Sequence, residues 1–563
     1  MVIIQKGLRS NIVHYRKVIE SHPIIQSYIE KLKIGEAIGA FIKQDARLEL
    51  SVEKTLCLMI HNILTTPKPM YEISDWLKPL NEEHIGMTTD EAQLINDDRV
   101  GKALEKFYVG RHKDVFFHLA LRAIKLFQLD CSQMHQDTTS ITFSGKYAGW
   151  SASELLTYGH NKDHRPDLKQ LVLGMSVTAD GSVPLMHRIY SGHQSDDKVH
   201  LRNHERLRKL LGKSDFIYVA DCKLATDENL NKIAACGGLF ISVMPRTWKE
   251  DTQFREKVRQ GSIKWKRILS RPDHRHPDSR RHRHLYDLAE GSYCSQKGGH
   301  RLLWILSSEK KQRDQETRQR HLARAIEDLK IIQTKLNRYH LKTQDQIQKR
   351  VNELLSLCQC SEFFRWHIED QIQETYHYGN TGRPKADAKK KKAIEKYFSL
   401  RFELDSTALA RAEMTDGIFP LITNVDEKMR SAKKVLETYK YQPFLEKRHT
   451  QLKTYQEIDP VYLKKDIRVV SYLHMHVMAL MVATLIERQL RLTMKLSKIK
   501  SLPIYPEQKP CKAPTMYDIV RLFSGVECYE LHQGDHVEVI PAQLSKLQKQ
   551  VIKMLGVPLS AYI

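Results

Sequence analysis

Three acidic side chains stand where carboxylates could carry out metal-dependent chemistry: Asp137, Asp221 and Glu446. Asp137 lies in a stretch rich in β-branched residues, 133–142, which predicts a strand, and Asp221 ends the continuous apolar run 216–220. A carboxylate at such a place is costly if buried without a partner or a function. Magnesium prefers hard oxygen ligands, and two such ions can activate the attacking oxygen and stabilise the leaving oxygen in phosphoryl transfer. These acids are therefore candidate ligands of a two-metal site.

The third acid is predicted on a helix that begins near Pro443, because proline suits the first turn, where its missing N–H costs nothing. Glu446 and Lys453 follow seven residues apart, two turns along one face, so a carboxylate would stand beside a cation. Each acid also has a structural interpretation. Asp137 could bond its threonine neighbours, Asp221 could cap a helix, and Glu446 could belong to a solvated charged face.

The charge balance points to a polyanionic partner. The 563 residues include 90 Lys and Arg against 67 Asp and Glu, a formal net charge of +23. Each phosphate that such a chain neutralises releases condensed counterions, so nucleic acid is favoured over the alternative, a membrane surface. Residues 469–486 are apolar enough to be weighed as a membrane span, but two histidines and flanking charges favour a helix buried behind a sheet. Nine scattered cysteines without a Cys-x-x-Cys pair favour a reduced, cytoplasmic protein.

The patterns around the acids predict an α/β fold with a mixed sheet, since an antiparallel hairpin through Asp180-Gly181-Ser182 is followed by alternating strand and helix. The N-terminal region reads as helical, and a DNA-binding role and a dimerisation role are equally open for it. The expected regions are a helical N-terminal domain (1–130), the first part of the core (131–245), an insertion with strands and a long helical hairpin at 310–376 (246–412), the second part of the core with the Glu446 helix (413–495), and a C-terminal appendage (496–563).

Two basic segments of the insertion could face phosphates. Residues 271–284 form a loop dense in His and Arg, for which phosphate contact or solvent exposure is favoured over metal binding. Gly382-Arg383-Pro384 resembles the core of an AT-hook, in which an extended arginine enters the narrow minor groove, and Arg383 is a candidate DNA contact on that ground. A solvated linker is the alternative.

Together, the motifs resemble those of bacterial insertion-sequence DDE transposases with an RNase H-like core. The similar stretches are Asp137-Thr-Thr-Ser, Val219-Ala-Asp221, the run 416–424 and a Tyr-x2-Arg-x3-Glu-x6-Lys signature. In this chain the signature has Tyr439, Gln442, Glu446 and Lys453, so its spacing fits in full and only its arginine is replaced. The resemblance covers most of residues 1–495.

The resemblance implies an RNase H-like catalytic core interrupted by the insertion before the third acid. Asp137, Asp221 and Glu446 would bind two Mg²⁺ ions, with Mn²⁺ as a substitute, and would catalyse cleavage at terminal inverted repeats and joining of the freed 3′-hydroxyl to target DNA. Tyr439, Gln442 and Lys453 would contact phosphates, Gln442 without a charge. The implied partner is double-stranded DNA, bound by a homodimer that brings two ends together, in the bacterial cytoplasm at the nucleoid and without a membrane.

Other classes of function stay open. An RNase H-fold nuclease or resolvase would cut DNA without joining it. A DNA-binding protein descended from a transposase would have lost the chemistry, although DNA binding alone has no use for three acids. Within the first class, Trp304 is a candidate for an aromatic that assists cleavage through a hairpin, but a core position is favoured because large aromatics are usually buried.

Overall fold

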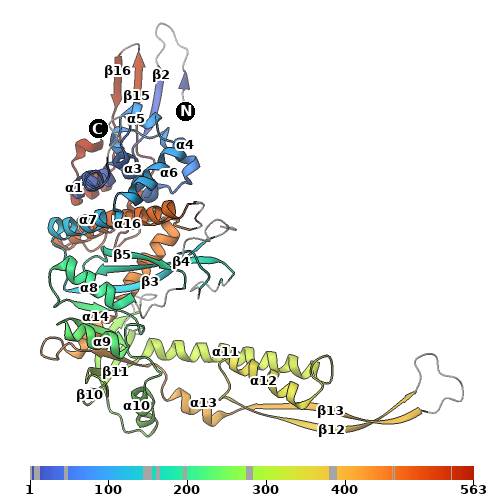
Figure 1. Ribbon diagram of the computed structural model, residues 1–563. Coiled ribbons are helices and arrows are strands. Elements are labelled where there is room, and N and C mark those ends of the chain that lie inside the picture. The colour runs from blue at the N-terminus through green and yellow to red at the C-terminus, as the bar shows by residue number, and fades with distance from the viewer. Residues whose placement is uncertain are drawn as a thin grey trace. The chain divides into compact units, whose positions relative to one another are not determined.

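The computed structural model describes residues 3–4, 13–43, 49–143, 155–159, 165, 167–193, 199–273, 283–378, 390–459, 461, 463, 465–533 and 536–562. The chain divides into two compact units (Figure 1). Unit 1 contains residues 1–242, 423–426 and 434–563, and unit 2 contains residues 243–422 and 427–433. All three candidate acids belong to unit 1.

The sheet of unit 1 is mixed, as the sequence predicts. Its strands are β3 (Gln133–Phe143), β4 (Lys169–Thr178), β5 (Pro184–Ser191), β6 (Ile217–Val219) and β7 (Leu239–Val243), in the spatial order β5-β4-β3-β6-β7. The first three are antiparallel, whereas β6 runs parallel to β3 and β7 parallel to β6. Gly181, with φ of +85°, makes the turn between β4 and β5, a backbone conformation that glycine adopts without steric cost.

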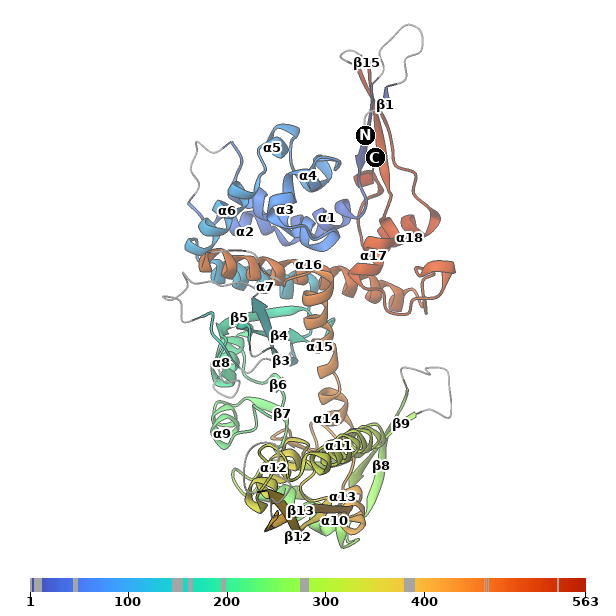
Figure 2. The same ribbon diagram turned by 90° about the vertical axis from the view of Figure 1, so that its right-hand side faces the viewer.

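Helices cover both faces of this sheet. On one face lie α8 (His200–Leu211) and α9 (Asp227–Ala235), and on the other lies α15 (Gln442–Thr450) (Figure 2). The hydroxyl of Tyr190 on β5 donates to Asn203 of α8 over 2.8 Å. On the opposite face, Gln442 of α15 bonds to β3. The sheet is therefore buried on both sides, which explains the nearly continuous apolar character of β4 and β6.

The helix α16 (Asp466–Leu496) lies beside α7 (His112–Phe127), between the strands on one side and α3 (Val52–Thr65) and α6 (Asp97–Val109) on the other, as both views show. By length and composition it could cross a membrane, but 94 % of its most apolar window is buried inside unit 1. Such burial is that of a core helix. The prediction of a buried helix at 469–486 is therefore confirmed.

The N-terminal helices are α1 (His22–Leu32), α2 (Ile34–Gly39), α3 (Val52–Thr65), α4 (Ile73–Leu77), α5 (Thr89–Gln93), α6 (Asp97–Val109) and α7 (His112–Phe127). The region is not wholly helical, because β1 (Ile3–Ile4) and β2 (Val13–Val18) join β15 (Glu527–Gln533) and β16 (His536–Ile540) in a sheet ordered β1-β2-β15-β16. The C-terminal region, which also holds α17 (Met516–Phe523) and α18 (Lys546–Met554), is thus part of unit 1 and not an appendage. The pairing of β2 with β15 could not be predicted from local periodicity, because the two strands are some five hundred residues apart.

Unit 2 holds the predicted insertion. Its strands β8 (Trp265–Pro272), β9 (Arg283–Ala289), β10 (Tyr293–Cys294), β11 (Arg301–Ser307) and β14 (Ile418–Thr423) are accompanied by α10 (Lys249–Arg259), α11 (Ser308–Lys335), α12 (Gln344–Leu357) and α13 (Ser406–Glu413). The helical pattern predicted to Tyr376 ends earlier, since β12 (Phe364–Tyr378) pairs with β13 (Lys390–Leu404) as a two-stranded ribbon. Phe364, Trp366 and Ile368 alternate along β12 and pack against the core formed by α11 and α12. This alternation, with every second side chain packed against the core, favours a strand over the predicted helix.

Buried histidines make unit 1 sensitive to acid. Burial lowers the pKa of His476 to about 3, and burial followed by the charges of His112 and Lys113 lowers that of His187 to about 3. An unfolded histidine titrates near pH 6.5, so between pH 6.5 and 3 the unfolded chain binds protons that the folded chain does not. The contribution of each such histidine to the free energy of unfolding is therefore fully present above pH 6.5 and is lost as the pH falls. At pH 5 the loss is about 2 kcal/mol for each such histidine.

We expect the thermal unfolding midpoint to fall between pH 7 and pH 5, measured by circular dichroism. The variant His476→Phe should show a shallower fall, because the ring nitrogens of His476 have no hydrogen-bond partner among the described residues and phenylalanine keeps the ring. A midpoint that does not change over this range would contradict the expectation.

Candidate active site

The first acid lies on β3, and the second follows the neighbouring parallel strand β6. In the register of β3 with β6, His135 pairs with Val219. Asp137 lies two residues beyond His135, and Asp221 lies two residues beyond Val219. Both residues therefore lie near the same end of two neighbouring strands, which in a sheet are about 4.8 Å apart.

Local hydrogen bonds orient both side chains. Asp137 Oδ1 accepts from the N–H of Thr138 over 2.8 Å, and Asp221 Oδ1 accepts from the N–H of Lys223 over 3.1 Å. The structural interpretation of Asp221 as a helix cap is wrong. The residue that caps α9 is Thr226, whose side chain accepts from the N–H of Asn229.

The third acid lies on α15, which begins at Gln442 with Pro443 in its first turn, as predicted. Tyr439 ends the preceding helix, α14 (Ala432–Tyr439). After Glu446 the helix widens into a π-helical turn, η5 (Gln451–Tyr455), in which the N–H of Gln456 bonds to Gln451 O over 3.0 Å. Lys453 lies in this turn, so the regular two-turn spacing from Glu446 to Lys453 does not hold. Single π-turns of this kind are frequent at functional sites.

The charges of the three acids bear on the hydroxyl of Tyr439. Burial raises the pKa of this hydroxyl well above its usual value, and the negative charges of Asp221, Cys222, Glu446 and Asp137 raise it further. Gln442 of α15 bonds to β3, so the helix that carries Glu446 lies against the strand that carries Asp137, more than three hundred residues away in the chain.

The three carboxylates do not form a closed metal site among the described residues. In the part of the chain that the structure describes, no three His, Cys, Asp or Glu side chains come close enough to hold one metal ion together. Asp137 and Asp221 nevertheless fit magnesium in donor type, since this ion takes a few carboxylate oxygens and keeps several water molecules. Glu446 is exposed on α15, so its side chain can change rotamer.

Gln442, which replaces the arginine of the resembled signature, points into the protein. Its Oε1 accepts from Nδ1 of His135 over 3.0 Å, and its Nε2 donates to Gln136 O over 3.0 Å. The side chain is 7 % exposed. Its amide is therefore occupied within unit 1, where it holds α15 against β3. The phosphate contact expected for this residue has no support in this arrangement.

Two residues next to Glu446 were missed by the sequence analysis. His449 is buried, and its Nδ1 lies 3.7 Å from Asp137 Oδ2. Arg448 forms a buried ion pair of 2.6 Å with Glu487 of α16 and also donates to Gly181 O over 2.8 Å. Glu487 could have been noticed, because a carboxylate inside an apolar helical run needs a buried partner.

The other residues singled out in the sequence lie in the insertion. Trp304 is 1 % exposed and stacks on Phe254 with ring centroids 3.9 Å apart, so its predicted core position is confirmed. Arg383 and residues 274–282 of the His-rich loop lie outside the described residues.

The fold defines this chain as a mixed α/β protein, with Asp137 on β3 and Asp221 just after the neighbouring strand of its sheet. In comparisons with known proteins, the profile of a domain of unknown function (DUF4277) matches residues 15–121. No curated protein matches. Six chains of solved structures match. One is in the cryo-EM structure of a piggyBac transposase synaptic complex with hairpin DNA, with 9 % identity over 83 % of this chain and 82 % of that chain and a TM-score of 0.26.

Proposed function

We propose that this protein is a DDE transposase, which cleaves DNA at the terminal inverted repeats of an insertion sequence and joins the freed 3′-hydroxyl to target DNA. The observation that carries the proposal is the placement of the three acids in unit 1: Asp137 lies on β3, Asp221 follows the neighbouring parallel strand β6, and Glu446 lies on α15, which Gln442 bonds to β3. The mixed sheet, with one aspartate on β3 and one just after β6, supports the RNase H-like core that the sequence motifs imply.

Asp137 and Asp221 would hold a first Mg²⁺ or Mn²⁺ ion between their strands, and Glu446 would reach a second ion from α15. When bound, the ions would activate the attacking oxygen and stabilise the leaving oxygen. The residues of the chain orient the DNA around them. Tyr439 keeps its proton at neutral pH and so can donate to a phosphate oxygen, and Lys453 offers a point charge from η5.

The expected partner is double-stranded DNA, both the element ends and the target. The formal net charge of +23 supports it, because phosphate neutralisation drives association. We further propose that a homodimer brings the two ends together in the bacterial cytoplasm, at the nucleoid, since joining both ends of one element requires two active sites. For a hairpin pathway, Trp304 is not available as a base-stacking aromatic in this structure, because it is stacked inside unit 2.

The test is an end-cleavage and joining assay with the full chain. Labelled duplexes with the sequences that flank the coding region are incubated with a supercoiled target plasmid and Mg²⁺. We expect cleavage at an inverted repeat followed by labelled, linearised or nicked plasmid, and loss of both products with a chelator.

The other outcomes separate the alternatives. Cleavage that never labels the plasmid would replace the proposal by a nuclease or resolvase. Specific binding of the flanking duplex without any cleavage would indicate a DNA-binding descendant that has lost catalysis.

A further inference from the structure

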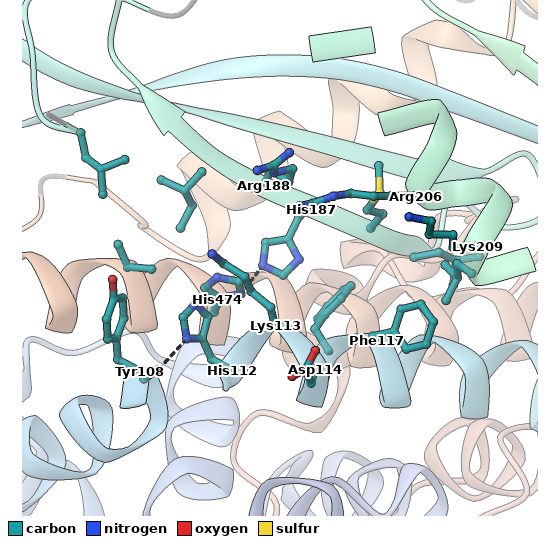
Figure 3. Close-up of a pocket in the computed structure, with 17 residues that line it drawn as sticks. Tyr108, His112, Lys113, Asp114, Phe117, His187, Arg188, Arg206, Lys209 and His474 are labelled. Atoms are coloured by element: carbon teal, nitrogen blue, oxygen red, sulfur yellow. Dashed lines mark hydrogen bonds between the residues drawn. The ribbon is translucent and has the colours of Figure 1, made fainter. Parts of the chain in front are cut away.

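A second site of unit 1 is a cavity of about 380 Å³ at the edge of the sheet, next to β5 (Figure 3). It is bounded by α7, β5, α8 and α16, and none of the three acids lines it. Its volume falls within the range of small-molecule sites, which are mostly apolar and contain a few placed polar groups.

The interior combines apolar walls with neutral imidazoles. The apolar walls come from Phe116, Phe117, Leu185, Leu210 and Val470. His112, His187 and His474 line one side, with His187 hydrogen-bonded to His474 and the ring of His112 edge-on to that of His474 at 4.3 Å (Figure 3). Burial is the main cause that lowers the pKa of all three, so the rings are neutral at pH 7.

Two imidazole nitrogens in this wall have unused hydrogen-bonding capacity. His112 Nε2 and His187 Nδ1 have no hydrogen-bond partner among the described residues, although His112 is only 5 % and His187 only 8 % exposed. An unpaired buried polar atom costs free energy unless a ligand or water pairs with it. A ligand that presents polar edges on a flat apolar body would satisfy both the nitrogens and the walls.

The mouth of the cavity carries an excess of positive charge. Lys113, Arg188, Arg206 and Lys209 line it, and Arg202 borders an adjoining hollow of about 350 Å³ that shares Arg188 and Arg206. The acids nearby are engaged, because Asp114 pairs with Arg111 and Glu205 pairs with Lys209.

Three of these arginines have no acidic partner. Among the described residues, no carboxylate forms an ion pair with Arg188, Arg202 or Arg206. Burial, and then the charges of Arg206 and Arg202, lower the pKa of Arg188. Guanidinium groups that are held together without a counter-charge form a site for an anion, and arginine suits phosphate because its planar fork can donate two parallel bonds.

We propose that this cavity binds a nucleoside 5′-phosphate, with the base between the apolar walls and the imidazoles and the phosphate against Arg188 and Arg206. Bases stack on aromatic side chains and are read by hydrogen bonds to their edges. This inference does not rest on the proposed function. The nucleotide has two possible sources, an unpaired nucleotide of a bound DNA strand or a free nucleotide.

His187 lies in register with Met175, which pairs with Asp137, so the cavity is two strands, roughly 10 Å, from the acids.

The test is equilibrium dialysis of the full chain against radiolabelled 2′-deoxyadenosine 5′-monophosphate. We expect saturable binding of one nucleotide per chain. The variant Arg206→Gln should weaken it about tenfold, as the loss of a charge-assisted bond predicts. The matched control is Arg208→Gln on the same helix, because Arg208 lines neither hollow. Phe117→Ala should weaken binding of the nucleotide but not of inorganic phosphate.

Competition identifies the source of the nucleotide. If a duplex with one unpaired terminal nucleotide displaces the label and a blunt duplex does not, the site serves a DNA strand; if only free nucleotides displace it, the site serves a metabolite. Three results would overturn the proposal: no saturable binding at millimolar nucleotide, displacement by inorganic phosphate as effective as by the nucleotide, or equal weakening by Arg208→Gln. Binding should persist in Asp137→Asn, which separates this site from the acids.

Discussion

Replacing Asp221 with asparagine should lower the rate of metal-dependent DNA cleavage by on the order of a thousandfold or more, because a lost metal ligand removes several kcal/mol of transition-state stabilisation. The same loss is expected for Asp137→Asn and Glu446→Gln. Asparagine keeps the shape of the side chain, and its amide oxygen can still accept the bond from the N–H of Lys223. The fold should therefore survive while the chemistry is lost.

The matched control is Asp215→Asn. Asp215 precedes β6 just as Asp221 follows it, but its side chain is 76 % exposed and pairs with Lys213 at the surface. Its substitution should leave cleavage unchanged. Rates are compared at saturating DNA, with circular dichroism and a DNA-binding assay run on every variant. Near wild-type cleavage by any one of the three acid variants would remove that residue from the site.

Replacing Glu487 with methionine should destabilise unit 1 by about 3–5 kcal/mol, the cost of leaving one member of a buried ion pair without its partner. Glu487 is fully buried and meets Arg448 at 2.6 Å and Arg491 at 3.3 Å. It also accepts from the N–H of Met516 over 2.9 Å. In the variant, the Arg448 charge would remain buried with only Gly181 O and the side chain of Gln451 as acceptors.

Urea unfolding followed by circular dichroism measures this loss. The double variant Glu487→Met with Arg448→Met should recover part of the stability, because it removes the stranded charge as well. The control Lys102→Met breaks a pair whose side chains are both more than 60 % exposed, so its effect should stay below about 1 kcal/mol. A small effect of Glu487→Met, equal to that of the control, would contradict the expectation.

The buried pair also bears on the acids. Arg448 is two residues from Glu446, so its bonds to α16 and to the turn at Gly181 hold the helix that carries the third carboxylate. Gln442 holds the start of the same helix against β3. The position of Glu446 is therefore set by polar contacts at both ends of α15.

The elements that depend on neighbouring residues could be predicted from the amino-acid sequence. The β-branched stretch around Asp137, the apolar run before Asp221 and Pro443 at the start of α15 each predicted the correct element, because strand and helix preferences act over a few residues. The burial of α16 was also predictable, since an apolar helix interrupted by histidines fits a protein core better than a lipid bilayer.

Which distant residues lie close together could be seen only in the folded protein. The pairing of His135 with Val219 places Asp137 and Asp221 near the same end of two neighbouring strands, and the side chain of Gln442 points inward and bonds to β3. The union of β2 with β15 joins the two ends of the chain in one sheet. Local patterns do not carry such contacts, because the free energy that selects them comes from packing and pairing between segments hundreds of residues apart.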